Sequence, residues 1–111
     1  MNNYQHKDLA SGRWGELTFF QQMGNIGSEV VRAIKWKNKG KKDYFLLAFE
    51  RALELFDLTI EDSKNIKRLK EITRGRELFA DYMVCDNIYK SDDKFFQNYF
   101  YQFSYAANIG K

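Results

Sequence analysis

Residues 18–40 read TFFQQMGNIGSEVVRAIKWKNKG, and this stretch decides the fold. It opens with Thr18-Phe19-Phe20-Gln21, the spacing of a capping box, in which the threonine and glutamine side chains each accept a hydrogen bond from the other residue's free backbone amide. Gly40 closes the stretch, and glycine tolerates the left-handed backbone found at many helix ends. Between these ends, apolar or small residues recur at helical spacing, at Phe20, Met23, Gly27, Val30 and Ile34. The stretch therefore predicts one amphipathic helix that ends near Lys39.

The same helical spacing continues through the rest of the sequence, which contains no proline. We expect a second helix capped by Asp43, and a third that begins at Asp62 or Ser63 and ends near Asp86. A fourth helix over residues 94–109 would follow Ser91-Asp92-Asp93, whose carboxylates suit the positive end of a helix. Connections of roughly three to six residues favour antiparallel neighbours. The sequence thus predicts an all-α fold, an antiparallel up-down-up-down four-helix bundle.

Two other interpretations compete with the bundle. The aromatic run over residues 95–105 would also suit a strand, but no Asn-Gly or Asp-Gly hairpin turn accompanies it. Residues 33–60 resemble a tetratricopeptide helix-turn-helix, but no second copy follows at the repeat length of ~34 residues. We therefore expect a helical hairpin within a bundle. The third helix would turn its apolar positions inward, namely Ile66, Leu69, Ile72, Phe79, Ala80 and Met83.

Composition limits the class of protein. The chain has 111 residues, 17% of them aromatic, a net charge of +3 and one cysteine, which indicates a single domain over residues 14–111 behind a flexible arm, residues 1–13. The lone Cys85 excludes a disulfide framework and favours a reducing, cytoplasmic location. No stretch approaches the ~18 apolar residues of a membrane span, so we expect no membrane partner.

Several short stretches together carry a resemblance. The chain resembles a family of small uncharacterised prokaryotic helical proteins in QMGNIGSEV at 22–30, Arg32-Ala33, Trp36, FERALEL at 49–55, DLTI at 57–60, Asp86-Asn87 and Tyr89. The resemblance covers roughly residues 14–107. It implies an α-helical bundle and a prokaryotic source, and it says nothing about catalysis.

The sequence contains few of the residue patterns that catalytic or metal sites require. Its one histidine, His6, lies in the expected arm, which holds an imidazole poorly for metal binding or nucleophilic catalysis. We therefore predict no catalytic residues, no metal ligands and no cofactor. Arg76 falls within the apolar arc of the third helix, where a guanidinium requires a partner. We expect a buried ion pair between Arg76 and Glu29 or Glu50, or alternatively an anion site that also uses Arg32.

Lysines gather around the first turn. Lys35, Lys37, Lys39, Lys41 and Lys42 form a cluster that could bind an anion such as nucleic acid. A second cluster, residues 64–74, would lie ~30 Å away at the opposite end of the bundle. Acidic residues near 86–93 would partly offset the first cluster. A nucleic-acid-associated accessory protein is therefore the alternative function.

The fourth helix is the most unusual segment, with seven aromatic residues between positions 95 and 105. One face of a helix can turn Phe96, Tyr99, Phe100 and Phe103 into the core, which leaves Phe95, Tyr101 and Tyr105 outside it. Exposed aromatic residues without neighbouring charges are typical of interface centres. We therefore expect a non-enzymatic interaction module that forms a homo-oligomer or binds a helical protein through these three residues. The glycines at 24 and 27 would allow a neighbouring helix to approach closely.

Overall fold

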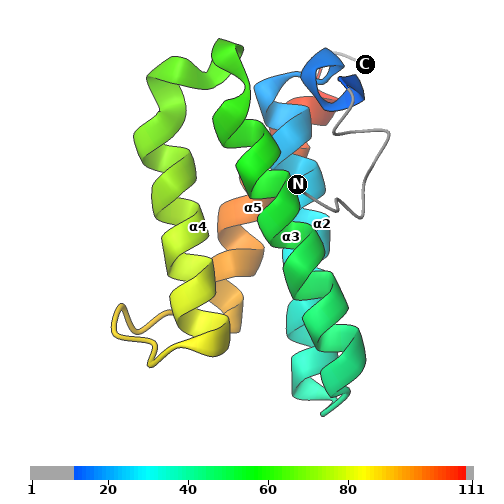
Figure 1. The fold of residues 1–111 in the computed structure, drawn as a ribbon, viewed down its shortest axis with the longest axis vertical. Coiled ribbons are helices and arrows are strands. Elements are labelled where there is room, and N and C mark those ends of the chain that lie inside the picture. Colours follow the sequence, from blue (N-terminus) through cyan, green and yellow to red (C-terminus); the bar gives the residue numbers. More distant parts are fainter. Residues whose placement is uncertain (1–11, 110–111) are drawn as a thin grey trace, which may run out of the picture.

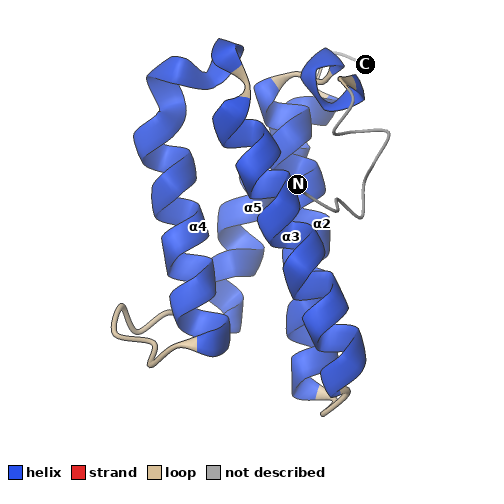
Figure 2. Cartoon of the chain, in the orientation of Figure 1, coloured by secondary structure: helices blue, strands red, loops and turns tan. Residues whose placement is uncertain are grey.

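The computed structural model describes residues 12–109, and this part of the chain is helical without strands (Figure 2). The elements are η1 (Arg13–Glu16), α2 (Phe19–Asn38), α3 (Lys42–Glu61), η2 (Ser63–Arg68), α4 (Leu69–Val84) and α5 (Asp93–Asn108). The predicted all-helical fold is confirmed. The expected arm and His6 lie outside the described residues, apart from the arm's last two positions, Gly12 and Arg13.

The four long helices pack as a compact bundle of 35 × 33 × 26 Å. The α2–α3 turn and the α4–α5 loop lie at one end, and the connection between α3 and α4 lies at the other (Figure 1). Helix α2 is the central element of the packing, since α3 and α5 both pack along it. Helix α4 packs mainly against α3. Among residues 12–109, none of the helices combines the length and the apolar character that a membrane crossing requires.

The helix ends follow local sequence signals. The Thr18 side chain accepts from Gln21 N and the Gln21 side chain accepts from Thr18 N, so the predicted capping box is present. Gly40 ends the α2 turn with a φ of +71°. Asp92 caps α5 by accepting from Phe95 N at 2.8 Å. The predicted Asp43 cap is wrong, because α3 begins one residue earlier, behind a Lys41 that makes no side-chain cap.

The expected third helix begins as a 3₁₀ segment. Asp62 caps it by accepting from Lys64 N at 3.1 Å, as predicted. Because a 3₁₀ helix has three residues per turn, η2 rotates its side chains away from the α-helical register. Ile66 is consequently 68% exposed rather than inside, and Asn65 takes the buried position.

Aromatic residues of α5 fill the centre of the core as predicted. Phe96, Phe100 and Phe103 are buried and Tyr99 is half-buried. Phe100 also lies against Gly27 of α2, where an added Cβ would stand 2.6 Å from Phe100 Cβ. The predicted close approach of a helix at this glycine is therefore confirmed.

Candidate functional site

An uncharged surface runs along the outside of α2 and α5. Two shallow hollows of about 300 and 390 Å³ adjoin there and share Ser28 and Ser104. No residue that lines either hollow is charged, although Asp, Glu, Lys and Arg make up 30% of the sequence. We call this surface the α2–α5 face and define it by its polar, small and exposed apolar residues: Gln21, Gly24, Asn25, Ser28, Val31, Gln97, Tyr101, Ser104, Tyr105 and Asn108.

Two tyrosines dominate the α2–α5 face. Tyr101 is 68% exposed and Tyr105 is 59% exposed, and their rings stack on each other with centroids 6.3 Å apart. Val31 of α2 lines the same hollow as Tyr101 and is also exposed. The predicted exposure of both tyrosines is confirmed.

Phe95 lies on a different side of α5. Its ring stacks on Tyr99 at a centroid distance of 6.0 Å and lines a cavity shared with α4. Tyr101 lies six positions further along the helix, which places the two side chains about 120° apart around its axis. The structure therefore brings Tyr101 and Tyr105 together but does not place Phe95 on the same surface.

The predicted buried ion pair of Arg76 is wrong. Arg76 Nε donates to Asp57 Oδ1 at 2.9 Å, and both side chains are more than one third exposed. Glu29 is buried and is paired with Arg32 on its own helix. Glu50 is exposed on α3. The guanidinium reaches outward along its long stem to an acid at the edge of α3, so it needs no buried partner.

The five lysines of the first turn are all exposed, as a surface cluster requires. One of them is tied to α4, since Lys37 Nζ donates to Met83 O at 2.9 Å near the helix's C-terminal end. Lys35 and Lys39 each lie over the Trp36 ring, at 5.5 and 5.6 Å from its centroid. Helical spacing alone does not indicate that Lys37 donates to a carbonyl of another helix.

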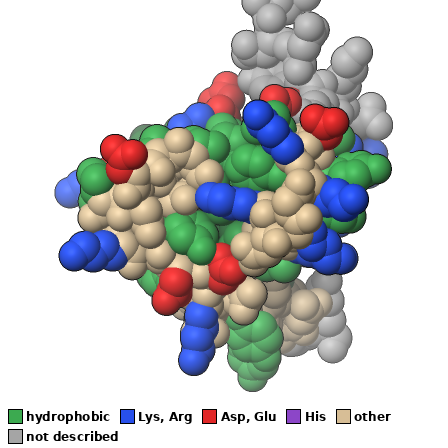
Figure 3. Space-filling view, turned by 90° about the horizontal axis from the view of Figure 1, so that it is seen from below, with side chains coloured by type: hydrophobic (Ala, Val, Ile, Leu, Met, Phe, Trp, Pro, Cys, Tyr) green, Lys and Arg blue, Asp and Glu red, His purple; other side chains and the backbone are tan. Residues whose placement is uncertain are grey.

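Acidic residues lie at the same end of the molecule as these lysines. Asn38, beside the cluster, donates to Asp93 Oδ2 at 2.8 Å. Viewed from below, Lys and Arg side chains are scattered among Asp and Glu side chains (Figure 3). Phosphate binding favours a continuous basic stripe, which this end does not show.

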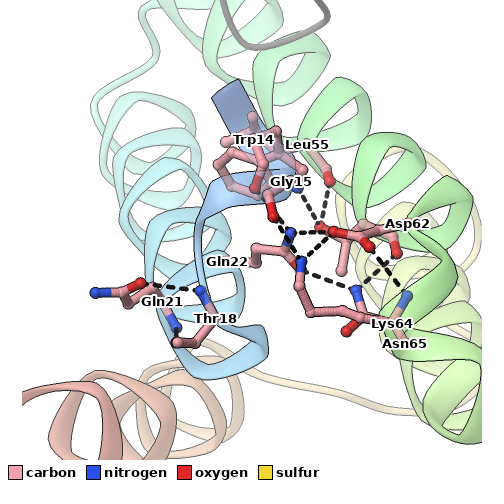
Figure 4. A network of polar contacts seen from close by, with 10 residues as sticks. Trp14, Gly15, Thr18, Gln21, Gln22, Leu55, Asp62, Lys64 and Asn65 are labelled. Carbon is pink, nitrogen blue, oxygen red and sulfur yellow. Dashed lines mark hydrogen bonds and ion pairs between the residues drawn. The ribbon is translucent and has the colours of Figure 1, made fainter. Parts of the chain in front are cut away.

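A buried polar network closes the opposite end (Figure 4). Gln22 donates to Trp14 O at 3.0 Å and to Asp62 Oδ2 at 2.8 Å, and Asn65 donates to Gln22 Oε1 at 2.8 Å. Trp14 Nε1 in turn donates to Thr59 Oγ1 at 3.0 Å. These contacts join η1, α2, the end of α3 and η2. Sequence reasoning missed them because three of the four link positions forty or more residues apart.

Asp62 is the ionisable member of this network. Burial alone would raise the pKa of its carboxyl, but hydrogen bonds from Lys64 and Gln22 outweigh burial and lower that pKa below the ordinary value of 3.8. The carboxylate is thus fixed as an internal acceptor, which is a structural task.

A further hollow of about 630 Å³ lies between α4 and residues 85–89 of the loop that follows it. Its charged groups along α4 are held by other parts of the chain: Arg76 by Asp57, Glu77 by the Tyr89 hydroxyl, and Asp81 by the amides of Ile88 and Tyr89. Within residues 12–109 no three His, Cys, Asp or Glu side chains are grouped as metal ligands. These contacts anchor the loop.

Comparison of the chain with protein-family models, curated proteins and solved structures finds no match. The resemblance to a family of small prokaryotic helical proteins therefore stays a prediction. The function must be argued from the surfaces themselves.

Proposed function

We propose that this protein is a non-enzymatic interaction module, an antiparallel up-down-up-down four-helix bundle that forms a homodimer through its α2–α5 face. The observation that carries the proposal is the absence of charged residues from the lining of both hollows on that face. The exposed thiol of Cys85 supports a reducing, cytoplasmic location.

Charge favours a second copy as the occupant. A two-fold dimer places the same patch of each subunit against itself. A charged patch would repel its own copy, whereas the residues that define the α2–α5 face carry no charge. Tyr101 and Tyr105 offer large contact area with few rotatable bonds, which lowers the entropy lost on association.

The area is sufficient for a specific contact. The full length of α5 and the diameters of two helices set an area about 24 Å long and about 20 Å wide. This area extends past the α2–α5 face to the exposed Arg32, Lys35 and Lys94, which continue its helical stripes toward the α2–α3 turn. Two such areas would bury about 1,000 Å² in total, at the lower end of specific interfaces. Phe95 is not part of this interface, because it lies toward α4.

The test is the molar mass in solution by light scattering coupled to size exclusion. The unaltered protein should be a dimer at micromolar concentration. The double variant Tyr101→Lys, Tyr105→Lys should be a monomer with unchanged helical circular dichroism, because it places like charges opposite each other. The matched control is Ile66→Lys, since Ile66 and Tyr101 are each 68% exposed, and it should remain a dimer. An unaltered protein that is monomeric, or a double variant that stays dimeric, contradicts the proposal.

Nucleic-acid association is the second candidate. Its support is the exposure of all five lysines around the α2–α3 turn. The Lys37 contact with α4 and the nearby Asp93 reduce that support.

A further inference from the structure

A small cavity separates α4 from α5. Its volume is about 170 Å³, and its lining is almost entirely apolar, with Gly75 and Leu78 from α4 and Phe95, Phe96, Tyr99 and Phe100 from α5. Glu71 and Arg74 also border it. Phe95 lies on this side of α5 and Tyr101 lies on the α2–α5 face. The cavity shares only the buried Phe100 with the hollows of that face, so it opens on a different side of α5 from the proposed dimer surface.

Gly75 keeps this cavity open. Glycine weakens the interior of a helix compared with alanine, so its presence in the middle of α4 requires a reason. Packing does not supply one, because an added Cβ would lie 3.5 Å from Phe56 Cε1 and 3.7 Å from the Tyr99 hydroxyl oxygen, both ordinary contacts. Gly27 differs, since its Cβ would collide with Phe100. The missing methyl group at position 75 therefore preserves space for something other than this chain.

The Tyr99 hydroxyl provides the polar group next to this space. Among the described residues no hydrogen bond to it is formed. The hydroxyl of a tyrosine is protonated at neutral pH and can donate a hydrogen bond. Burial, assisted by the charge of Glu71, raises the pKa of Tyr99 further, from 10.0 to about 12. Glu71 itself lies 3.7 Å from Arg68 in an ion pair.

We propose that the α4–α5 cavity binds a neutral single-ring aromatic molecule and that the Tyr99 hydroxyl donates a hydrogen bond to an acceptor on it. An apolar protein cavity of about 150 Å³ holds benzene, so the volume suits one ring. The surrounding phenylalanine rings offer edge and face contacts. A charged ligand is disfavoured, because the apolar lining would remove its hydration. Arg74 at the border lies over the Tyr89 ring, 4.6 Å from its centroid, and would have to leave that contact to pair with an anion.

The experiment uses acetophenone, toluene and benzoate as probes, with binding followed by ligand-observed NMR and titration calorimetry. Acetophenone and toluene should bind saturably and benzoate should not. Gly75→Ala should lower the affinity for acetophenone and for toluene by about ten-fold or more, because a methyl group fills part of the cavity. Tyr99→Phe should lower the affinity for acetophenone by about three- to ten-fold and leave the affinity for toluene unchanged, because only acetophenone accepts a hydrogen bond. Thr73→Ala, at an exposed position on the same helix, is the control and should change nothing.

Three outcomes would overturn the assignment. The first is an unaltered protein that binds neither neutral probe at millimolar concentration. The second is a Gly75→Ala variant that keeps its melting cooperativity and binds as well as the unaltered protein. The third is a Tyr99→Phe variant whose affinities for toluene and acetophenone fall equally, which would show that the Tyr99 hydroxyl donates no hydrogen bond to the ligand. The monomeric double variant at Tyr101 and Tyr105 should still bind both neutral probes, so failure of the dimer leaves this test intact.

Discussion

Gly27 and Phe100 meet at the crossing of α2 and α5, where a Cβ on residue 27 would lie 2.6 Å from Phe100 Cβ and 3.0 Å from its Cγ. Phe100 is itself buried and in ring contact with Phe56 of α3. The crossing therefore ties three helices together at one glycine.

Gly27→Ala should lower the free energy of unfolding by about 1–3 kcal/mol, because the methyl group would force the two helices apart in a filled core. Urea denaturation followed by circular dichroism measures this. A variant as stable as the unaltered protein would show that the helices can separate without loss.

Gly75→Ala, unlike Gly27→Ala, should stabilise the protein and raise its free energy of unfolding by about 0.5–1 kcal/mol. The new Cβ finds only ordinary contacts with Phe56 and Tyr99, while the helix gains a better helix former. The same denaturation experiment compares it with Gly27→Ala. Destabilisation by both substitutions would show that the α4–α5 cavity has no room for a methyl group.

The features that sequence predicted correctly depend on local geometry. The capping box needs only Thr18 and Gln21 three residues apart, and the outward direction of Tyr101 and Tyr105 follows from their place on a helix whose other face is apolar. Predictions of such features do not depend on how the helices are rotated relative to each other. Most of the fold could be predicted for this reason.

The features that sequence missed depend on contacts between distant segments. Helical spacing predicts that Arg76 is buried, but its long side chain reaches outward to Asp57 at the edge of α3. The 3₁₀ start of the third helix exchanges Ile66 for Asn65, and neither sequence position signals that change. The partner of a long or polar side chain thus cannot be derived from helical spacing alone.

Arg76→Met and Asp57→Ala should each change the free energy of unfolding by less than about 1 kcal/mol, because exposed ion pairs contribute little. Both side chains are more than one third exposed, so solvent screens the pair. Thermal melts in low and high salt measure the effect. A loss of several kcal/mol for Asp57→Ala would mean that Arg76 is left with an uncompensated buried charge.

Asp62→Asn should lower the melting temperature at neutral pH. A carboxyl with a lowered folded-state pKa stabilises the fold above its unfolded pKa, and that contribution disappears as the pH falls through the folded-state pKa. The difference between the variant and the unaltered protein should therefore shrink as the pH falls below 3.8. Melts across an acid series measure it, with the exposed Asp43→Asn as control. A difference that persists unchanged in acid would show that Asp62 acts without its charge.

Nucleic-acid association has a distinct signature in salt. If the lysines of the α2–α3 turn contact phosphates, replacing Lys39, Lys41 and Lys42 together by alanine should flatten the slope of log affinity against log salt, because each contact releases counterions. Lys37 is left in place, since its ammonium group donates to Met83 O and its loss would disturb α4 as well. The control replaces Lys67 and Lys70, in and just after η2, by alanine, and Lys64 is left in place because it donates to Gly15 O and pairs with Asp62. An unchanged slope in the first variant would move the contact away from this turn, and the absence of binding by the unaltered protein at low salt would leave the uncharged α2–α5 face as the functional surface.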